Sequence, residues 1–336
     1  MDERKLVKSG MFSHTIALPK EWVTRHKLNK GSKVYLTEHQ GALLLTPEKS
    51  KISLKEKGET MINIDGLAKN SIKRDIIASY LTNSGVVKLI GKDIKKNAQT
   101  YKEVISQLPG LEVIEETGDY IIVHDFINIE ELNIPDIIKR TDIIIRSLFE
   151  DTFECLQNKS SDLAESIRKR DKEINRLVFL VYKCLNHVND HPQEGKNHGI
   201  ESPSCSTHIW ELNGYLEKIG DEIKRFASLV PKSKISAKEN KEVENLLKDV
   251  EKFYIEIMTS LYKGSTANAD ESSEKRGEIK DKCNAFLEES KSPALTSIVS
   301  KLIYLISFIN SISRIVRYIL FDKHVVVRGP IISSKK

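Results

Sequence analysis

The sequence predicts a multidomain protein with three parts: a short β-rich segment, a small α+β domain and a long all-α region. Three observations lead to this division. Residues 3–47 contain short strand-like stretches around one short helix. Residues 51–130 alternate strand-like and helix-like stretches, and from about Pro135 onward apolar residues recur at helical spacing. At 336 residues the chain is long enough for two or three domains.

The first part is predicted from its strands and turns. RKLVKSG and HTIAL read as strands, and Pro19 begins a short helix from Lys20 to His26, where a missing N–H is tolerated. A turn at 28–32 leads to the alternating strands KVYLTEH and ALLLTP. About 45 residues bury too little surface to fold alone, and this segment has no cysteine to staple it. We therefore expect it to oligomerise.

The second part, residues 51–130, is predicted as a small α+β linker domain. Its strand-like pieces and the helical stretches 69–81 and 94–108 follow the order β-α-β-α-β-β, with helices on one sheet face. It contains no glycine-rich phosphate loop, no metal-ligand spacing and no nucleophile elbow. A connecting role and ligand sensing both remain open for it.

The third part, residues 136–323, is predicted as a six-helix bundle followed by a tail, 324–336. Two successive sets of three helices of similar length indicate an internal duplication. The last helix contains LIYLISFINSISRIVRYIL, but Asn310, Arg314 and Arg317 interrupt it, which favours a helix buried in a bundle or at a dimer contact over a membrane span. The predicted helices are 136–158, 160–188, 206–230, 237–263, 272–290 and 293–322.

Composition favours a soluble, cytoplasmic, non-enzymatic protein that is not an integral membrane protein. The chain starts with charged residues and no apolar signal segment, and its net charge of +5 is compatible with nucleic acid without being diagnostic. No Ser-His-Asp, Cys-His or paired-acid constellation points to catalysis. Four widely separated cysteines suggest reduced thiols rather than disulfides: Cys155, Cys184, Cys205 and Cys283.

The loop between the second and third predicted helices is rich in soft metal ligands. Their spacing matches no familiar zinc pattern, so a flexible loop with polar histidines is predicted instead of a structural zinc site. The residues concerned are Cys184, His187, His191, His198, Cys205 and His208.

Two carboxylates stand out in the predicted helix 206–230. Glu217 and Asp221 project off its apolar face one turn apart, and like charges at that spacing repel by a few tenths of a kcal/mol. Lys224 and Arg225 could offset them as surface ion pairs. A bound hard cation is the alternative, because such cations take carboxylate oxygens from more than one element.

The stretch LEKIGDEIKRFA resembles the signature of the PhoU family, close to L-E-R-I-G-D, and RDKEIN at 170–175 resembles that family's D-x-x-(V/I)-(D/N). The resemblance implies a metal ion, divalent or trivalent (Mg, Mn, Fe or Zn), held at the bundle surface by two neighbouring helices. Asp171 and Asn175 would supply one side, and Glu217 and Asp221 the other. Phosphate could bind as an additional ligand of the metal.

The second set of helices does not keep these residues. Ser307 and Ser311 stand where the two carboxylates of helix 206–230 stand. Arg276 and Lys280 fall roughly opposite Asp171 and Asn175, with Glu274 and Glu278 nearby. Hydroxyls and cations cannot replace carboxylates as ligands of a hard metal. We therefore expect one metal site per chain.

The first 48 residues resemble the AbrB/MazE/SpoVT fold through Leu18-Pro19-Lys20-Glu21-Trp22, Leu28 and Gly31. The resemblance implies a swapped-hairpin β barrel (AbrB-like) built by two chains, with a basic face for DNA. Val23 and Thr24 stand where family members often carry arginines, so dimerisation is the safer inference. The matching basic positions are Arg4, Lys5, Lys8, Lys20 and Arg25.

Together the resemblances imply a metal-binding regulator of phosphate uptake that dimerises through its first part, in a fusion that looks archaeal. It would act as a DNA-binding transcriptional regulator. The alternative is an adaptor that does not bind DNA and modulates a phosphate transporter or its sensor kinase. A metal-dependent hydrolase on the bundle surface is the remaining class.

Overall fold

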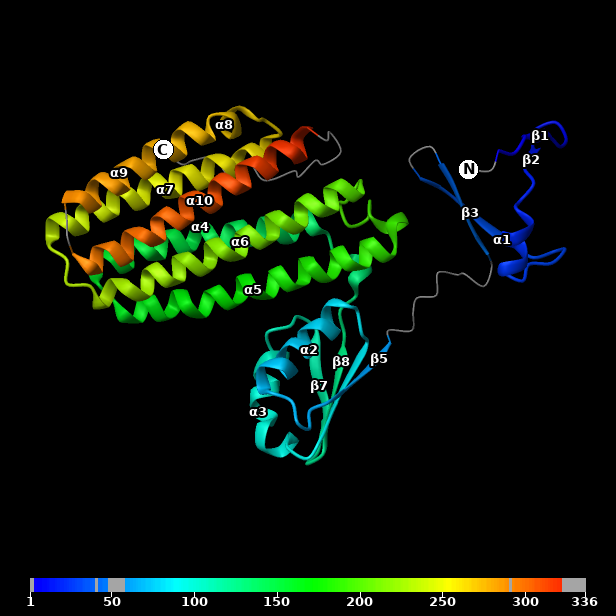
Figure 1. The fold of residues 1–336 in the computed structure, drawn as a ribbon, viewed down its shortest axis with the longest axis horizontal. Helices are drawn as coiled ribbons and strands as arrows, with labels where there is room; N and C mark the ends of the chain where they lie inside the picture. The colour runs from blue at the N-terminus through cyan, green and yellow to red at the C-terminus, as the bar shows by residue number, and fades with distance from the viewer. Residues whose placement is uncertain (1–2, 40–41, 48–57, 290–291, 322–336) are drawn as a thin grey trace. The chain divides into compact units, whose positions relative to one another are not determined.

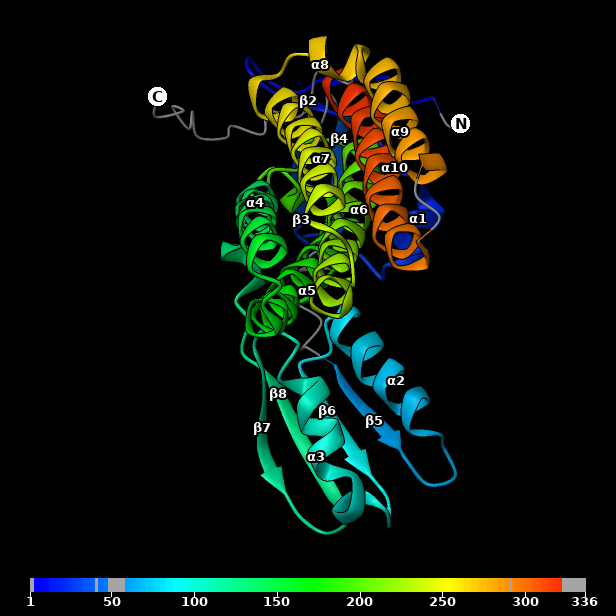
Figure 2. The ribbon, with the colours of Figure 1, turned by 90° about the vertical axis from the view of Figure 1, so that its left-hand side faces the viewer.

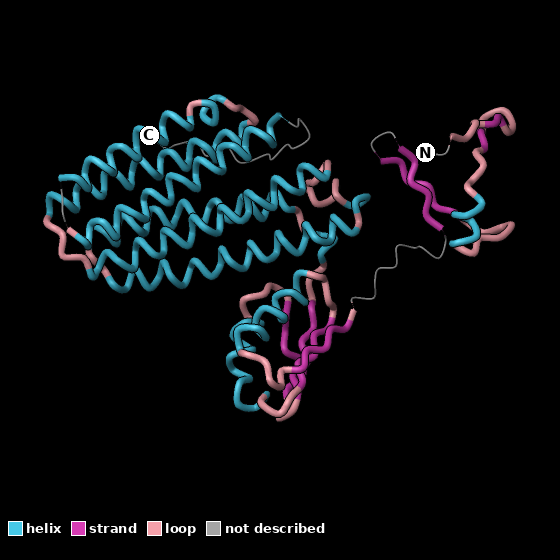
Figure 3. Tube along the Cα trace, in the orientation of Figure 1, coloured by secondary structure: helices cyan, strands magenta, loops and turns pink. Residues whose placement is uncertain are grey.

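The computed structural model describes residues 3–39, 42–47, 58–289 and 292–321. By its contacts the chain divides into two units, residues 1–57 and residues 58–336, and each is described by itself (Figures 1 and 3). The tail predicted at 324–336 lies outside the described residues.

The first unit contains two separate antiparallel hairpins with a short helix between them. Strands β1 and β2 pair with Val7 opposite Thr15, and β3 and β4 pair with Val34 opposite Pro47. The described residues of this unit form no closed barrel. The elements are β1 (Val7–Lys8), β2 (His14–Thr15), α1 (Lys20–Arg25), β3 (Val34–His39) and β4 (Ala42–Pro47).

This unit has almost no interior of its own. None of the described side chains of residues 3–36 is buried, although apolar side chains normally supply the main driving force for folding. Large apolar side chains of this unit therefore face solvent. The exposed large apolar residues are Leu6, Val7, Met11, Phe12, Ile16, Tyr35, Leu36 and Leu43. The swapped barrel itself stays a prediction.

The second unit begins with a four-stranded mixed sheet in the order β5-β6-β8-β7 (Figure 2). Strand β5 is parallel to β6, and β8 is antiparallel to both of its neighbours. Helices α2 and α3 contribute Ile72, Ile76 and Tyr101 to a common core with the sheet. The observed element order is the predicted one: β5 (Glu59–Asn63), α2 (Lys69–Leu81), β6 (Val86–Ile90), α3 (Ile94–Ile105), β7 (Leu111–Glu116) and β8 (Tyr120–Asp125).

A helical bundle with one continuous apolar core follows the sheet. Its helices start at side-chain caps: the hydroxyl oxygens of Ser160, Ser202 and Ser236 accept hydrogen bonds from the first turns of α5, α6 and α7. The helices are α4 (Ile134–Asn158), α5 (Ser161–Asp190), α6 (Pro203–Leu229), α7 (Ala237–Lys263), the short α8 (Ala267–Asp270), α9 (Ser272–Glu289) and α10 (Pro293–Phe321).

Helix α10 is long and apolar enough to cross a membrane, judged by length and composition alone. In this fold it packs along α6, α7 and α9. Leu302, Ile306 and Ile309 are completely buried in the bundle core. One face of the helix therefore packs into the bundle core, which is one of the two placements that the sequence favours.

Helix α5 also contacts the α+β part of the same unit. Lys183, whose side chain is 1% exposed, forms an ion pair with Asp125 of β8 at 2.9 Å and donates to the carbonyl oxygen of Tyr80 at 2.9 Å. The amide of Asn186 donates to the carbonyl oxygen of Leu81 at 2.9 Å. These buried polar contacts fasten the sheet domain to the bundle.

Candidate functional site between α5 and α6

The two predicted ligand pairs lie on neighbouring helices that approach each other closely. Asp171 and Asn175 belong to α5, and Glu217 and Asp221 belong to α6. Gly220 permits the close approach: a Cβ atom there would lie 2.8 Å from Ile174 Cδ1 and 3.4 Å from Asp171 Oδ1. Asp171 therefore faces the turn of α6 that carries both predicted carboxylates.

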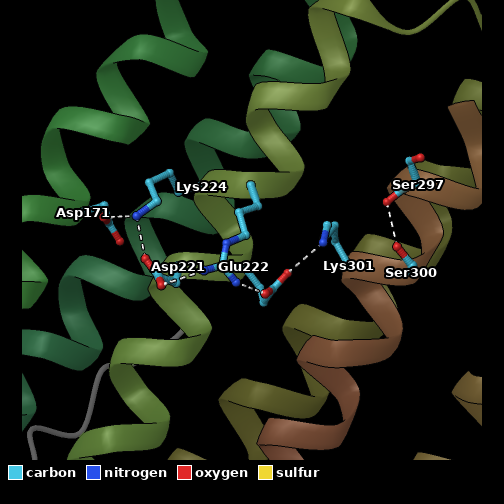
Figure 4. A network of polar contacts seen from close by, with 8 residues as sticks. Asp171, Asp221, Glu222, Lys224, Ser297, Ser300 and Lys301 are labelled. Atoms are coloured by element: carbon cyan, nitrogen blue, oxygen red, sulfur yellow. Dashed lines mark hydrogen bonds and ion pairs between the residues drawn. The ribbon is translucent and has the colours of Figure 1, made fainter.

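A lysine joins the two helices at this point (Figure 4). Lys224 Nζ lies 2.6 Å from Asp171 Oδ2 and 2.5 Å from Asp221 Oδ1. Arg225 adds a contact of 3.1 Å to the other oxygen of Asp221. The ion-pair interpretation of the sequence is thus observed, and Lys224 pairs across the helices as well as along its own.

The network continues to α10 through a carboxylate that the sequence interpretation missed. Glu222, only 4% exposed, pairs with Arg225 and lies 3.6 Å from Lys301 Nζ. Figure 4 shows this second branch beside the first. The sequence could have predicted its burial, because Glu222 lies three residues after Ile219 and four before Phe226, both on the apolar face of the helix.

The carboxylates of this network are held in surroundings that disfavour their charge. Burial raises the pKa of Asp171 above its usual value, although the hydrogen bond from Lys224 opposes that rise. Burial also raises the pKa of Glu217, and the negative charges of Asp221 and Asp171 raise it further. A cation bound beside them would relieve both effects.

Two oxygen atoms at the site lack a hydrogen-bond partner among the described residues: Asp171 Oδ1 and Asn175 Oδ1, both buried. A buried acceptor without a donor costs free energy, so such atoms call for a ligand. Together with Glu217 and Asp221 they make an all-oxygen set suited to a hard cation. The residues present therefore fit the predicted metal, provided that Lys224 yields its position among the carboxylates.

A shallow hollow of about 350 Å³ opens beside these carboxylates. Four of its lining side chains are cationic, which favours an anion over an apolar ligand. The lining residues are Arg168, Lys224, Arg225, Ser228, Leu229 and Lys301.

The corresponding serines of the later helices make no comparable cluster. Ser307 Oγ donates to the carbonyl oxygen of Ile303 at 3.0 Å, and Ser311 Oγ donates to that of Ser307 at 3.1 Å. Their hydroxyls are engaged by their own helix. The expectation of a single site per chain stays a prediction.

The residues predicted to contact DNA are all exposed in the first unit. They are Arg4, Lys5, Lys8, Lys20 and Arg25. Binding of these residues to DNA phosphate groups stays a prediction.

The loop histidines correct the sequence interpretation. His187 and His198 are 8% and 1% exposed, respectively, and the connection between α5 and α6 folds into a short 3₁₀ helix, η3 (Pro192–Glu194), followed by turns. His198 contacts Leu132 in the segment before α4, a contact that spacing within the loop could not show.

Comparison with known families places the candidate site inside a recognised domain. Residues 140–230 match the family model described as the PhoU domain, and this range contains all four predicted ligand residues. No curated protein and no solved structure matches the chain. The AbrB-like interpretation of the first unit gains no support from these comparisons. The match over α4–α6 supports placing this part of the chain with the PhoU family, a family of phosphate-uptake regulators.

Proposed function

We propose that this protein is a metal-responsive regulator of phosphate uptake whose sensing site lies between α5 and α6. The carrying observation is the arrangement inside the PhoU-like range: Lys224 bridges Asp171 and Asp221 while Asp171 Oδ1 stays without a partner. Without metal the lysine supplies the positive charge. With metal, Asp171, Asn175, Glu217 and Asp221 would hold the ion.

The donor set favours Mg²⁺, Mn²⁺ or Fe ions over a purely soft metal. Carboxylate and amide oxygens are hard ligands, and the site offers no thiolate and no imidazole among its four residues. A bound ion supplies a Lewis-acid centre for anions. This chain's own part is to fix the oxygens on two helices and to release Lys224 from Asp171 and Asp221.

Phosphate is the proposed effector, as an additional ligand of the metal. The cationic hollow lies next to the carboxylates, and Lys224 takes part in both. A lysine released by metal binding would be free to pair with an anion in that hollow. Metal and phosphate binding would therefore reinforce each other.

The first unit is proposed to form a homodimer that contacts DNA. Its apolar side chains are exposed and its described residues 3–36 contain no buried side chain, so a second copy supplies the missing core. Each basic residue would then be presented twice along the DNA.

A salt-titrated DNA-binding assay separates this proposal from the adaptor alternative. Changing Lys8→Ala and Arg25→Ala together should weaken binding to a selected genomic fragment and flatten the salt slope by about one unit per lost phosphate contact. Lys95→Ala with Lys96→Ala, exposed on α3, removes the same charge as a control. Dimers that bind no fragment, or an unchanged slope, would favour an adaptor acting on a transporter or sensor kinase.

A further inference from the structure

We infer a second metal site, separate from the carboxylate cluster, formed by His187 near the end of α5 and by Glu194 and His198 in the connection between α5 and α6. One potential ligand atom from each of these residues lies within 4.8 Å of the other two. Asp171 lies sixteen residues before His187 on the same helix, which corresponds to about 24 Å at the rise of an α-helix. The two sites are therefore independent.

His198 carries the inference. Its ring is 1% exposed, and Nδ1 lies 2.8 Å from the carbonyl oxygen of Leu132. A carbonyl oxygen only accepts, so Nδ1 must carry the proton, and Nε2 of the neutral ring holds a lone pair. Among the described residues that buried Nε2 has no hydrogen-bond partner. This is the pattern of a metal-ligating histidine, whose second nitrogen is oriented by a backbone carbonyl.

The other two residues supply a nitrogen and a carboxylate oxygen that already meet. His187 Nε2 lies 2.6 Å from Glu194 Oε2. His191 stacks on the His187 ring with centroids 4.4 Å apart, which restrains its orientation. Metal bonds of about 2.0–2.2 Å would move this nitrogen and oxygen to roughly 3.3 Å apart, an adjustment that the partly exposed Glu194 side chain can make.

Zn²⁺ suits these three ligands. Two imidazole nitrogens and one carboxylate oxygen are a known zinc set that leaves a fourth, open position for water. Co²⁺ has similar preferences and serves as a spectroscopic probe. Mg²⁺ does not suit the set, because it prefers oxygen ligands. The ligand chemistry thus distinguishes this site from the carboxylate cluster.

The position of the site gives it a structural consequence. His198 is fastened to the segment before α4 through Leu132, and its own carbonyl oxygen accepts from Ile134 N at 3.1 Å. One turn before His187 on α5 stands Lys183, which pairs with Asp125 of the sheet domain. A metal here would brace the place where the α+β part joins the bundle.

The test is zinc binding to the full chain after removal of metals with a chelator. Competition with a chromogenic chelator should show one tight Zn²⁺ per chain, and Co²⁺ should give a visible absorption band that Zn²⁺ displaces. His198→Asn keeps a donor near the Nδ1 position and removes Nε2. Glu194→Gln keeps the shape of the partly exposed residue. Each should weaken zinc binding by more than about tenfold.

Two controls separate this site from the proposed regulatory site. His208→Asn removes a histidine outside the group and should leave zinc affinity unchanged. The pair Glu217→Gln with Asp221→Asn should also leave it unchanged, even if it abolishes Mg²⁺ or Mn²⁺ binding. Absence of bound zinc in the wild type would overturn the inference. Equal affinity and an unchanged Co²⁺ spectrum in both His198→Asn and Glu194→Gln would do the same.

Discussion

The ion pair between Lys183 and Asp125 should contribute strongly to the stability of the contact between the sheet domain and the bundle. The two side chains are 1% and 0% exposed, and the ammonium group also donates to the carbonyl oxygen of Tyr80. Removing one partner of a buried pair leaves the other charge uncompensated and typically costs about 3–5 kcal/mol. Lys183→Met should therefore lower the free energy of unfolding by about that amount.

An exposed ion pair serves as the control for this loss of stability. Lys282 and Asp249 are 2.6 Å apart, but their side chains are 59% and 37% exposed, so Lys282→Met should cost at most about 1 kcal/mol. Lys183→Met combined with Asp125→Asn leaves no buried charge and should recover part of the loss. Urea unfolding of the three variants, followed by circular dichroism, measures these differences. A Lys183→Met variant no less stable than Lys282→Met would refute the reasoning.

Two further predictions concern the approach of α5 to α6. Gly277 has open space around it, so Gly277→Ala should raise the free energy of unfolding by about 0.5–1 kcal/mol. Gly220→Ala should lower it, because an overpacking cost of about 1–3 kcal/mol exceeds that gain. Thermal melts compare the two variants. Burial raises the folded-state pKa of Glu217, so between its usual pKa and that raised value the unfolded protein loses this proton more readily than the folded protein. The free energy of unfolding therefore falls as pH rises through that range. Glu217→Gln should remove that fall in chelator-treated protein and exposed Glu173→Gln should not; equal pH profiles of unfolding for the two variants would contradict the assignment.

Helix and strand positions could be predicted because they depend on local spacing. The period of apolar residues placed α7 at 237–263, as observed, and the β-α-β-α-β-β order followed from strand-like pieces alternating with helical stretches. The start of α6 was predicted three residues late. That helix begins at Pro203 because Ser202 caps it. The N-cap serine and the following proline mark the start of the helix, whereas the period of apolar residues does not.

The contacts between distant segments could not be predicted in the same way. His198 is buried against Leu132, which lies 66 residues earlier in the chain, and Lys183 meets Asp125 across two parts of the fold. No local pattern specifies such partners. Sequence reasoning therefore proposed the carboxylates of α6 but predicted a flexible loop with polar histidines.

The metal dependence of stability tests the proposed function most directly. Chelator-treated full chain would be melted with and without Mn²⁺ or Mg²⁺, beside a variant carrying Glu217→Ala and Asp221→Ala. Without metal the variant loses the repulsion between Glu217 and Asp221 but also the partly exposed ion pairs of Asp221 with Lys224 and Arg225. These opposing changes are small, so its stability should stay within about 1 kcal/mol of the wild type. With metal at about 100 times its dissociation constant, the wild type alone should gain about 2.7 kcal/mol. A wild type whose melting is unaffected by either ion would contradict a metal site at these carboxylates.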